Sequence, residues 1–151
     1  MVLVKQKLLS NIMEKKNIFS TFLQWLKSTE MFARPSKQLP GKWKLFEYYV
    51  DAEDDLQHFT ESQLKKAKEN WIIEFLEEEI YKQQSQLPIP IISNIENGNW
   101  SISKNFITFI HPNNFRNNVE FQFAIEKGIL KLLKKDAFGK IEFFGFFKGQ
   151  D

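Results

Sequence analysis

Apolar and polar residues follow two different periods along this chain, and the change falls near residue 41. Residues 18–32 repeat apolar side chains every three or four positions, which predicts an amphipathic helix. The prolines and glycine between Arg34 and Gly41 then predict a linker. We therefore divide the chain into a basic helical extension with its linker, over 1–38, and a second domain over 39–151.

From Gly41 onward, apolar residues mostly alternate with polar ones, which is the pattern of half-buried β-strands. Short turns, such as the one at Asn97-Gly98, separate the alternating stretches. The predicted strands are 42–50, 71–75, 79–87, 99–103, 106–110, 119–128, 129–136 and 140–148. This succession predicts a mainly β fold, a small antiparallel up-and-down β-barrel of about eight strands with an N-terminal amphipathic helical extension.

Residues 61–80 admit two interpretations. Thr60 and Gln63 form a capping-box pattern, so a helix is expected to begin at residue 61. Apolar residues at helical spacing would allow that helix to run to residue 80. Alternatively, the helix ends near Asn70 and two strands follow it. We favour the strands, because the remainder of the chain is β.

The first and last predicted strands are apolar on both faces, although a barrel strand needs only one apolar face. Strict alternation in the first strand separates Trp43, Leu45 and Tyr49 from Phe46, Tyr48 and Val50. In the last strand it separates Ile141, Phe143 and Phe147 from Phe144 and Phe146. First and last strands are neighbours in an up-and-down barrel, so their outward residues would merge into one apolar patch.

We expect the helix over 18–32 to cover this patch, because it lies directly upstream across a short linker. The competing interpretation docks the helix on a membrane or a protein partner, and the patch then closes a homodimer. The interaction residues predicted on either view are Phe19, Phe22, Leu26, Phe46, Tyr48, Phe144 and Phe146.

Charge and composition add limits to this picture. Residues 1–38 hold seven basic and two acidic groups, and 39–151 hold the other 14 basic and 17 acidic ones, so a basic arm precedes a mildly acidic body. The chain has no cysteine, which excludes disulfides, thiolate metal sites and a cysteine nucleophile. It has neither an apolar stretch long enough to span a bilayer nor a good secretory signal, so we expect a cytoplasmic protein, with export as the alternative.

Candidate chemistry is sparse. His58 near Asp55 could form a general base, but no nucleophile motif accompanies it, and His111 precedes a proline at a strand end. The acidic stretch 51–55 lacks the glycine and distal glutamate of a calcium loop, so a solvated turn is the simpler interpretation. Lysines lie among aromatic residues in the last strands, but glutamates share those strands, which argues against nucleic acid. We expect no enzyme activity, no cofactor and no metal site.

Three features together resemble the lipocalin-like (calycin) β-barrels, of the bacterial lipocalin-like type. They are Gly41-Lys42-Trp43 at the first strand, Gly98-Asn-Trp-Ser-Ile102 followed by Asn105-Phe-Ile-Thr-Phe109, and the closing meander with its phenylalanines. The resemblance implies that Trp43 plugs the closed end of the barrel. It also implies a basic residue of the last strand across that tryptophan, for which Lys148 is the nearest candidate. The family implies either a small hydrophobic ligand inside the barrel or a domain that has lost its cavity.

The leading functional hypothesis is therefore binding of a small hydrophobic ligand inside the barrel. The candidate lining residues are Trp43, Phe121, Phe123 and Phe143, with Tyr49 or Trp100 as a polar contact. The rival hypothesis is a protein-interaction or structural module with a filled barrel, which acts through the N-terminal helix or the outer apolar patch. The abundance of phenylalanine, 16 residues, is compatible with such filling.

Overall fold

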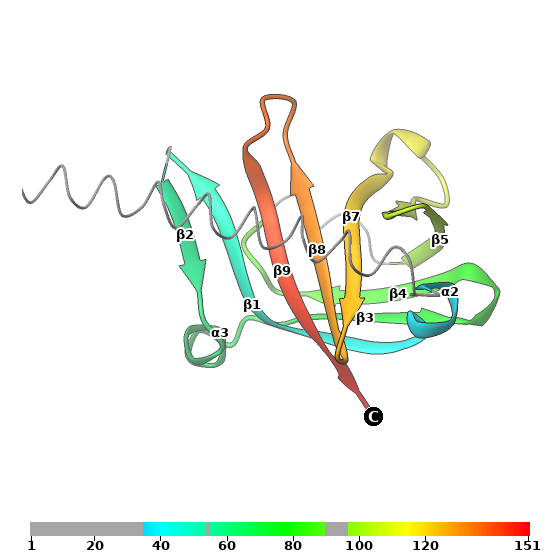
Figure 1. Ribbon diagram of the computed structural model, residues 1–151, viewed down its shortest axis with the longest axis horizontal. Coiled ribbons are helices and arrows are strands. Elements are labelled where there is room, and N and C mark those ends of the chain that lie inside the picture. Colours follow the sequence, from blue (N-terminus) through cyan, green and yellow to red (C-terminus); the bar gives the residue numbers. More distant parts are fainter. Residues whose placement is uncertain (1–34, 54, 90–96) are drawn as a thin grey trace, which may run out of the picture.

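The computed structural model describes residues 35–53, 55–89 and 97–151 (Figure 1). The predicted helix over 18–32 lies outside the described residues, as do the predicted interaction residues Phe19, Phe22 and Leu26. The helices are α2 (Pro35–Gln38), α3 (Glu61–Ala67) and two single 3₁₀ turns, η1 (Glu77–Glu79) and η2 (Phe115–Asn117). The strands are β1 (Gly41–Ala52), β2 (Asp55–Phe59), β3 (Trp71–Leu76), β4 (Ile80–Ser85), β5 (Asn97–Ser103), β6 (Phe106–Ile110), β7 (Val119–Glu126), β8 (Ile129–Lys135) and β9 (Ile141–Gln150).

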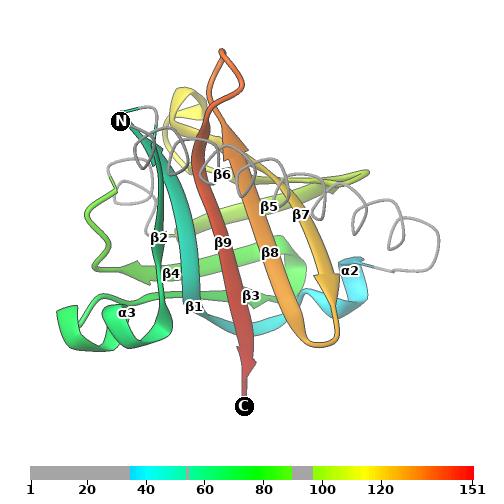
Figure 2. The ribbon, with the colours of Figure 1, turned by 60° about the vertical axis from the view of Figure 1, so that its left-hand side comes forward.

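The strands form one antiparallel sheet that closes on itself, because β9 pairs back onto β1. Eight strands, β1 and β3 to β9, make the closed barrel (Figures 1 and 2). This confirms the mainly β prediction and the eight-stranded antiparallel barrel. Closure pairs each barrel strand with a neighbour on both sides over part of its length, which limits edge-to-edge aggregation.

The short strand β2 was not predicted. It pairs with the far half of β1, from Tyr48 to Ala52, on the same edge that β3 occupies from Gly41 to Lys44. Glu53 takes a positive φ of 52° in the turn, so the chain reverses there and adds a strand where an acidic loop was expected. Between the two pairings, one edge of β1 has no strand partner, and α3 lies beside β1 near this break.

The ambiguity over residues 61–80 is resolved in favour of strands. The Thr60 hydroxyl accepts a hydrogen bond from the Gln63 backbone N–H, and the Gln63 side chain accepts from the Thr60 N–H, so the predicted capping box is present. The helix ends after Ala67, because Lys68 adopts a left-handed conformation with φ 54°. Two strands, β3 and β4, then form a hairpin in register from Trp71–Ser85 to Leu76–Ile80.

A β-bulge in β1 overturns part of the predicted alternation. Leu45 pairs with Phe147 but Glu47 pairs with Phe146, so Phe46 is an extra residue on β1. The bulge reverses the faces of all the residues that follow it. Tyr48 points into the barrel and is 1% exposed, so its assignment to the outer patch is wrong. Tyr49 lies on the outside, so its assignment as an inward polar contact is also wrong.

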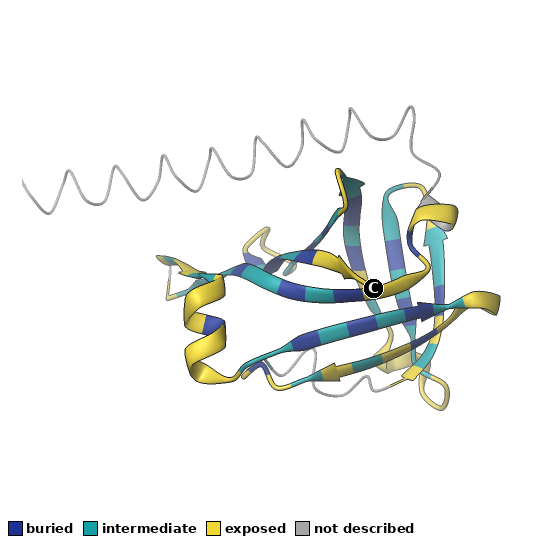
Figure 3. Cartoon of the chain, turned by 90° about the horizontal axis from the view of Figure 1, so that it is seen from below, coloured by how far each residue is buried: buried dark blue, intermediate teal, exposed yellow. Residues whose placement is uncertain are grey.

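A second irregularity affects the last strand. Lys134 pairs with Phe143 and Lys135 with Ile141, which leaves Glu142 as the extra residue. Phe143 and Phe147 face inward and Phe144 and Phe146 face outward, as alternation predicts. Ile141 instead joins the outer residues. Buried and partly exposed positions alternate along most of the barrel wall (Figure 3).

Candidate functional site

Aromatic rings occupy the barrel interior. The centroid of Trp71 on β3 lies 6.3 Å from that of Phe121 on β7, and these two strands stand opposite each other in the eight-stranded ring. Trp71 also meets Phe143 edge-on at 5.3 Å, and Phe109 contacts both Phe121 at 5.6 Å and Phe75 at 5.8 Å. Side chains from opposite walls therefore touch across the centre of the barrel.

The residues predicted to line a ligand site are distributed as follows. Trp43, Trp100, Phe121, Phe123 and Phe143 are all buried members of the interior cluster, with at most 6% of their surface exposed. Tyr49 is outside, as described above. The predicted inward residues are thus brought together, but they pack against one another as members of one hydrophobic core.

The polar groups of the interior tryptophans already have protein partners. Trp43 Nε1 donates to the Leu39 carbonyl oxygen at 2.8 Å, and Trp100 Nε1 donates to the Ile80 carbonyl oxygen at 3.2 Å. Trp71 Nε1 donates to Gln83 Oε1. Since an indole nitrogen has a single N–H, these tryptophans cannot donate to a ligand without breaking those bonds.

The hydroxyl of Tyr81 is an exception. It is buried and has no hydrogen-bond partner within the part of the chain that the structure describes. Burial raises the pKa of Tyr81 to about 12, because the charged phenolate is disfavoured away from water. Burial, followed by the charge of Glu69, raises the pKa of Tyr48 to about 12 as well. Both phenols are neutral at physiological pH.

A second apolar cluster lies on the outside of the barrel, and we call it the outer surface. It spans five neighbouring strands, β7, β8, β9, β1 and β2. Its members are Tyr49, Leu56, Ala124, Leu133, Ile141, Phe144 and Phe146. The rings of Phe144 and Phe146 meet edge-on at 4.8 Å, and Tyr49 lies 6.2 Å from Phe144.

Polar groups border the outer surface. Lys131 Nζ lies 5.4 Å from the centroid of the Phe146 ring, and burial lowers the pKa of Lys131. Tyr49 stacks on His58 at 4.2 Å, and His58 Nε2 lies 2.7 Å from Glu47 Oε2. The structure therefore places Glu47 beside His58, a pairing that the sequence did not suggest.

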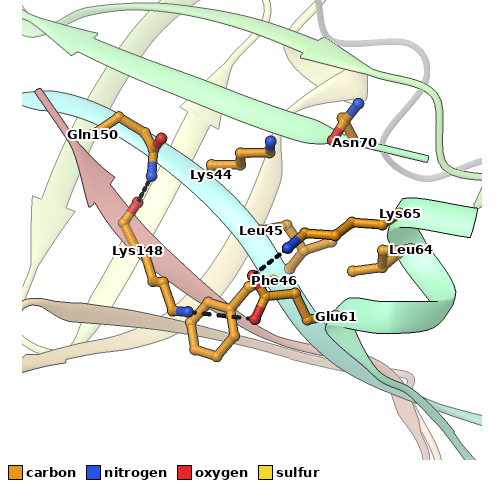
Figure 4. Close-up of a pocket in the computed structure, with 9 residues that line it drawn as sticks. All are labelled: Lys44, Leu45, Phe46, Glu61, Leu64, Lys65, Asn70, Lys148 and Gln150. Carbon is orange, nitrogen blue, oxygen red and sulfur yellow. Dashed lines mark hydrogen bonds and ion pairs between the residues drawn. The ribbon is translucent and has the colours of Figure 1, made fainter. Parts of the chain in front are cut away.

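A pocket of about 230 Å³ opens beside the barrel wall at the point where β1 lacks a strand partner (Figure 4). It is lined by Lys44, Leu45, Phe46, Glu61, Leu64, Lys65, Asn70, Lys148 and Gln150. Strands β1 and β9 supply one wall and α3 the other. No sequence pattern pointed to this pocket, because its residues come from four separate parts of the chain.

Lys148 occupies a place that the family resemblance did not predict. Its Nζ lies 4.4 Å from the centroid of the Phe46 ring and 3.5 Å from Glu61 Oε2, in this pocket. The residue of β9 in register with Trp43 is Gly149. Lys148 is in register with Lys44 instead, and the Trp43 indole N–H is bound to the Leu39 carbonyl oxygen.

Two remaining expectations concern metals and membranes. Within residues 35–53, 55–89 and 97–151, no group of three or more histidine or carboxylate side chains is arranged to hold a metal ion. His111 Nδ1 instead accepts hydrogen bonds from the backbone N–H groups of Asn113 and Asn114. None of the described helices has the length and apolar character needed to cross a bilayer.

Comparison with known proteins finds no protein-family model, curated protein or solved structure that matches this chain. The resemblance to lipocalin-like barrels therefore stays a prediction drawn from three short motifs.

Proposed function

We propose that this protein is a non-enzymatic interaction module, in which a filled barrel presents the outer surface to an amphipathic helix. The helix that we assign to this surface is residues 18–32 of the same chain. The observation that carries the proposal is the burial of the outer surface. Phe144, Leu133, Ala124 and Ile141 are 2–4% exposed although they point away from the barrel interior.

The described helices do not account for this burial. Helix α2 contacts β7 and helix α3 contacts β1, and neither is a principal neighbour of β8 or β9, where most of the outer surface lies. Contiguous apolar patches of this kind are seldom left open to water on a soluble domain. A covering segment is therefore expected.

The dimensions of the outer surface suit residues 18–32. Five strands at about 4.8 Å spacing extend over about 19 Å from the first to the last. A 15-residue α-helix is about 22 Å long. The helix can therefore reach all five strands when it lies across them.

The connection also suits this arrangement. Only residues 33 and 34 separate the predicted helix from α2, which begins at Pro35 and contacts β7. Strand β7 is one end of the outer surface. The chain thus enters the barrel domain beside the surface that we propose residues 18–32 cover.

The absence of cysteine from the chain allows a direct test. In the full-length protein, Phe22→Cys combined with Phe146→Cys should form a disulfide on mild oxidation, and the product should have the mass of a monomer. Thr21→Cys with Phe146→Cys is the matched control, because Thr21 is on the polar face of the predicted helix. A cross-linked dimer would assign the helix to a second copy, and equal cross-linking of both pairs would contradict the proposal.

A truncation that starts at Gln38 provides an independent measurement. The proposal predicts that it associates or precipitates and unfolds at a lower temperature than the full chain. A truncated protein that is monomeric, soluble and as stable as the full chain would show that nothing essential covers the outer surface.

Under the rival hypothesis, a small hydrophobic ligand at the centre of the barrel would have to separate Trp71 from Phe121. Contacts among buried rings are costly to break, because each ring loses its packing partners. Native mass spectrometry of protein purified from its own host tests this directly. A stoichiometric bound apolar molecule would favour the ligand hypothesis over the filled barrel.

A further inference from the structure

The side pocket next to α3 has an excess of positive charge. Three lysines line it, Lys44, Lys65 and Lys148, against one carboxylate, Glu61. Glu61 forms ion pairs with two of these lysines, since its Oε1 lies 3.5 Å from Lys65 Nζ and its Oε2 lies 3.5 Å from Lys148 Nζ. The described residues provide no ion-pair partner for Lys44. The lining therefore carries a net charge of +2 with a single internal anion.

The apolar part of the lining is equally well defined. Leu45 and Leu64 are 3% and 5% exposed and belong to the interior cluster, so they form a buried apolar base. The ring of Phe46 stands beside the Lys148 ammonium, which places an aromatic face next to a cation (Figure 4). A ligand that fits must combine negative charge with an apolar group.

The size of the pocket limits that ligand. A volume of about 230 Å³ is below the roughly 300–1,000 Å³ of sites for drug-sized molecules. It exceeds what one or a few waters need, since each takes about 30 Å³. The site thus suits a molecule of the size of a single aromatic ring with one charged group.

We propose that this pocket binds a small organic anion, with its phosphate or carboxylate held by Lys44 and Lys148 and its apolar group against Leu45, Leu64 and Phe46. In the absence of the anion, the Glu61 carboxylate pairs with Lys148, so it competes with the anion for that lysine. The backbone supports this role, because the β1 bulge at Phe46 and the gap between β2 and β3 create the pocket. The pocket borders the outer surface, since the ring centroid of Phe46 lies 6.4 Å from that of Phe146, but the proposal does not depend on what covers that surface.

The experiment uses the full chain and phenyl phosphate as the probe, with inorganic phosphate alone and benzoate as separate arms. Calorimetric titration should show saturable 1:1 binding of phenyl phosphate. Its affinity should exceed that of inorganic phosphate, because only the former has a ring for the apolar base. The affinity should also fall as salt is added, because the charged contacts are close to solvent.

Three variants make the test specific. Lys44→Met with Lys148→Met should weaken binding at least tenfold, whereas Lys66→Met is the matched control, because Lys66 is an exposed neighbour on α3 outside the lining. Glu61→Gln should strengthen binding several-fold, because it removes the competing carboxylate. Thermal midpoints measured without ligand will show whether the variants remain folded.

Several results would overturn the proposal. They are the absence of saturable binding, an equal loss in Lys66→Met, and weaker binding in Glu61→Gln. Vesicles of phosphatidylcholine with and without phosphatidylglycerol form a last arm. Binding to anionic vesicles without binding to phenyl phosphate would assign the lysines to a membrane surface and reject the small-anion site.

Discussion

The ring contacts across the barrel interior make Trp71 the most informative side chain to remove. It is 1% exposed and its ring contacts Phe121, Phe143 and Phe147, with the last at 5.0 Å. A buried aromatic side chain removes about 150–250 Å² from water, and at about 25 cal/mol per Å² this is worth about 4–6 kcal/mol. Measured losses for replacing a core Phe or Trp by Ala are about 3–5 kcal/mol.

We therefore expect Trp71→Ala to lower the free energy of unfolding by about 4 kcal/mol. For a domain of this size, that corresponds to a fall of about 8–16 °C in the thermal midpoint. The variant also leaves Gln83 without the indole N–H. Ile72→Ala is the matched control, since the neighbouring side chain is only partly buried, and its loss should be clearly smaller.

The same variant tests the filled barrel. An emptied site among apolar rings can bind small apolar molecules, as engineered cavities do. We expect benzene or indole to raise the thermal midpoint of Trp71→Ala and to leave that of the unmodified chain unchanged. If the unmodified chain binds these probes equally well, the interior is not filled and the reasoning fails. If Trp71→Ala does not fold, the milder Trp71→Leu supplies the same comparison.

Three further variants test individual contacts. Tyr81→Phe deletes a buried hydroxyl without a described partner, so the free energy of unfolding in chemical denaturation should stay unchanged or rise by up to about 1–3 kcal/mol. A clear fall in that free energy would reveal a hydrogen bond to the hydroxyl. Gly145→Ala should lower the thermal midpoint by several degrees, because the added methyl carbon would lie 2.6 Å from Phe143 Cε1 and 3.0 Å from Leu45 Cδ1. An unchanged midpoint would contradict this packing. The charges of Lys148 and then Lys65 hold the pKa of Glu61 below its usual 4.5, so the stabilising contribution of the Glu61 carboxylate is present above the unfolded pKa and is lost as pH falls through the lower folded pKa. The difference in thermal midpoint between the unmodified chain and Glu61→Gln should therefore shrink over that pH range. A difference that persists in strong acid would refute the pairing.

Local patterns in the sequence were sufficient for much of the barrel. The capping box at Thr60 predicted where α3 begins, because its two hydrogen bonds join residues only three positions apart. Alternation predicted the inward positions of Phe121 and Phe123, because β7 has no bulge and every second side chain of a regular strand shares a face.

The tertiary structure decided the features that depend on pairing between distant strands. One extra residue at Phe46 exchanged the faces of Tyr48 and Tyr49, and strict alternation cannot foresee a bulge that arises from the register of β1 against β9. Likewise, Lys148 and Glu61 meet across 87 positions of the chain, and the pocket that they line exists only where β2 and β3 leave part of β1 unpaired. The sequence by itself therefore determined the barrel class and most of its core, whereas its outer surface and its pocket follow from contacts that form only when the sheet closes.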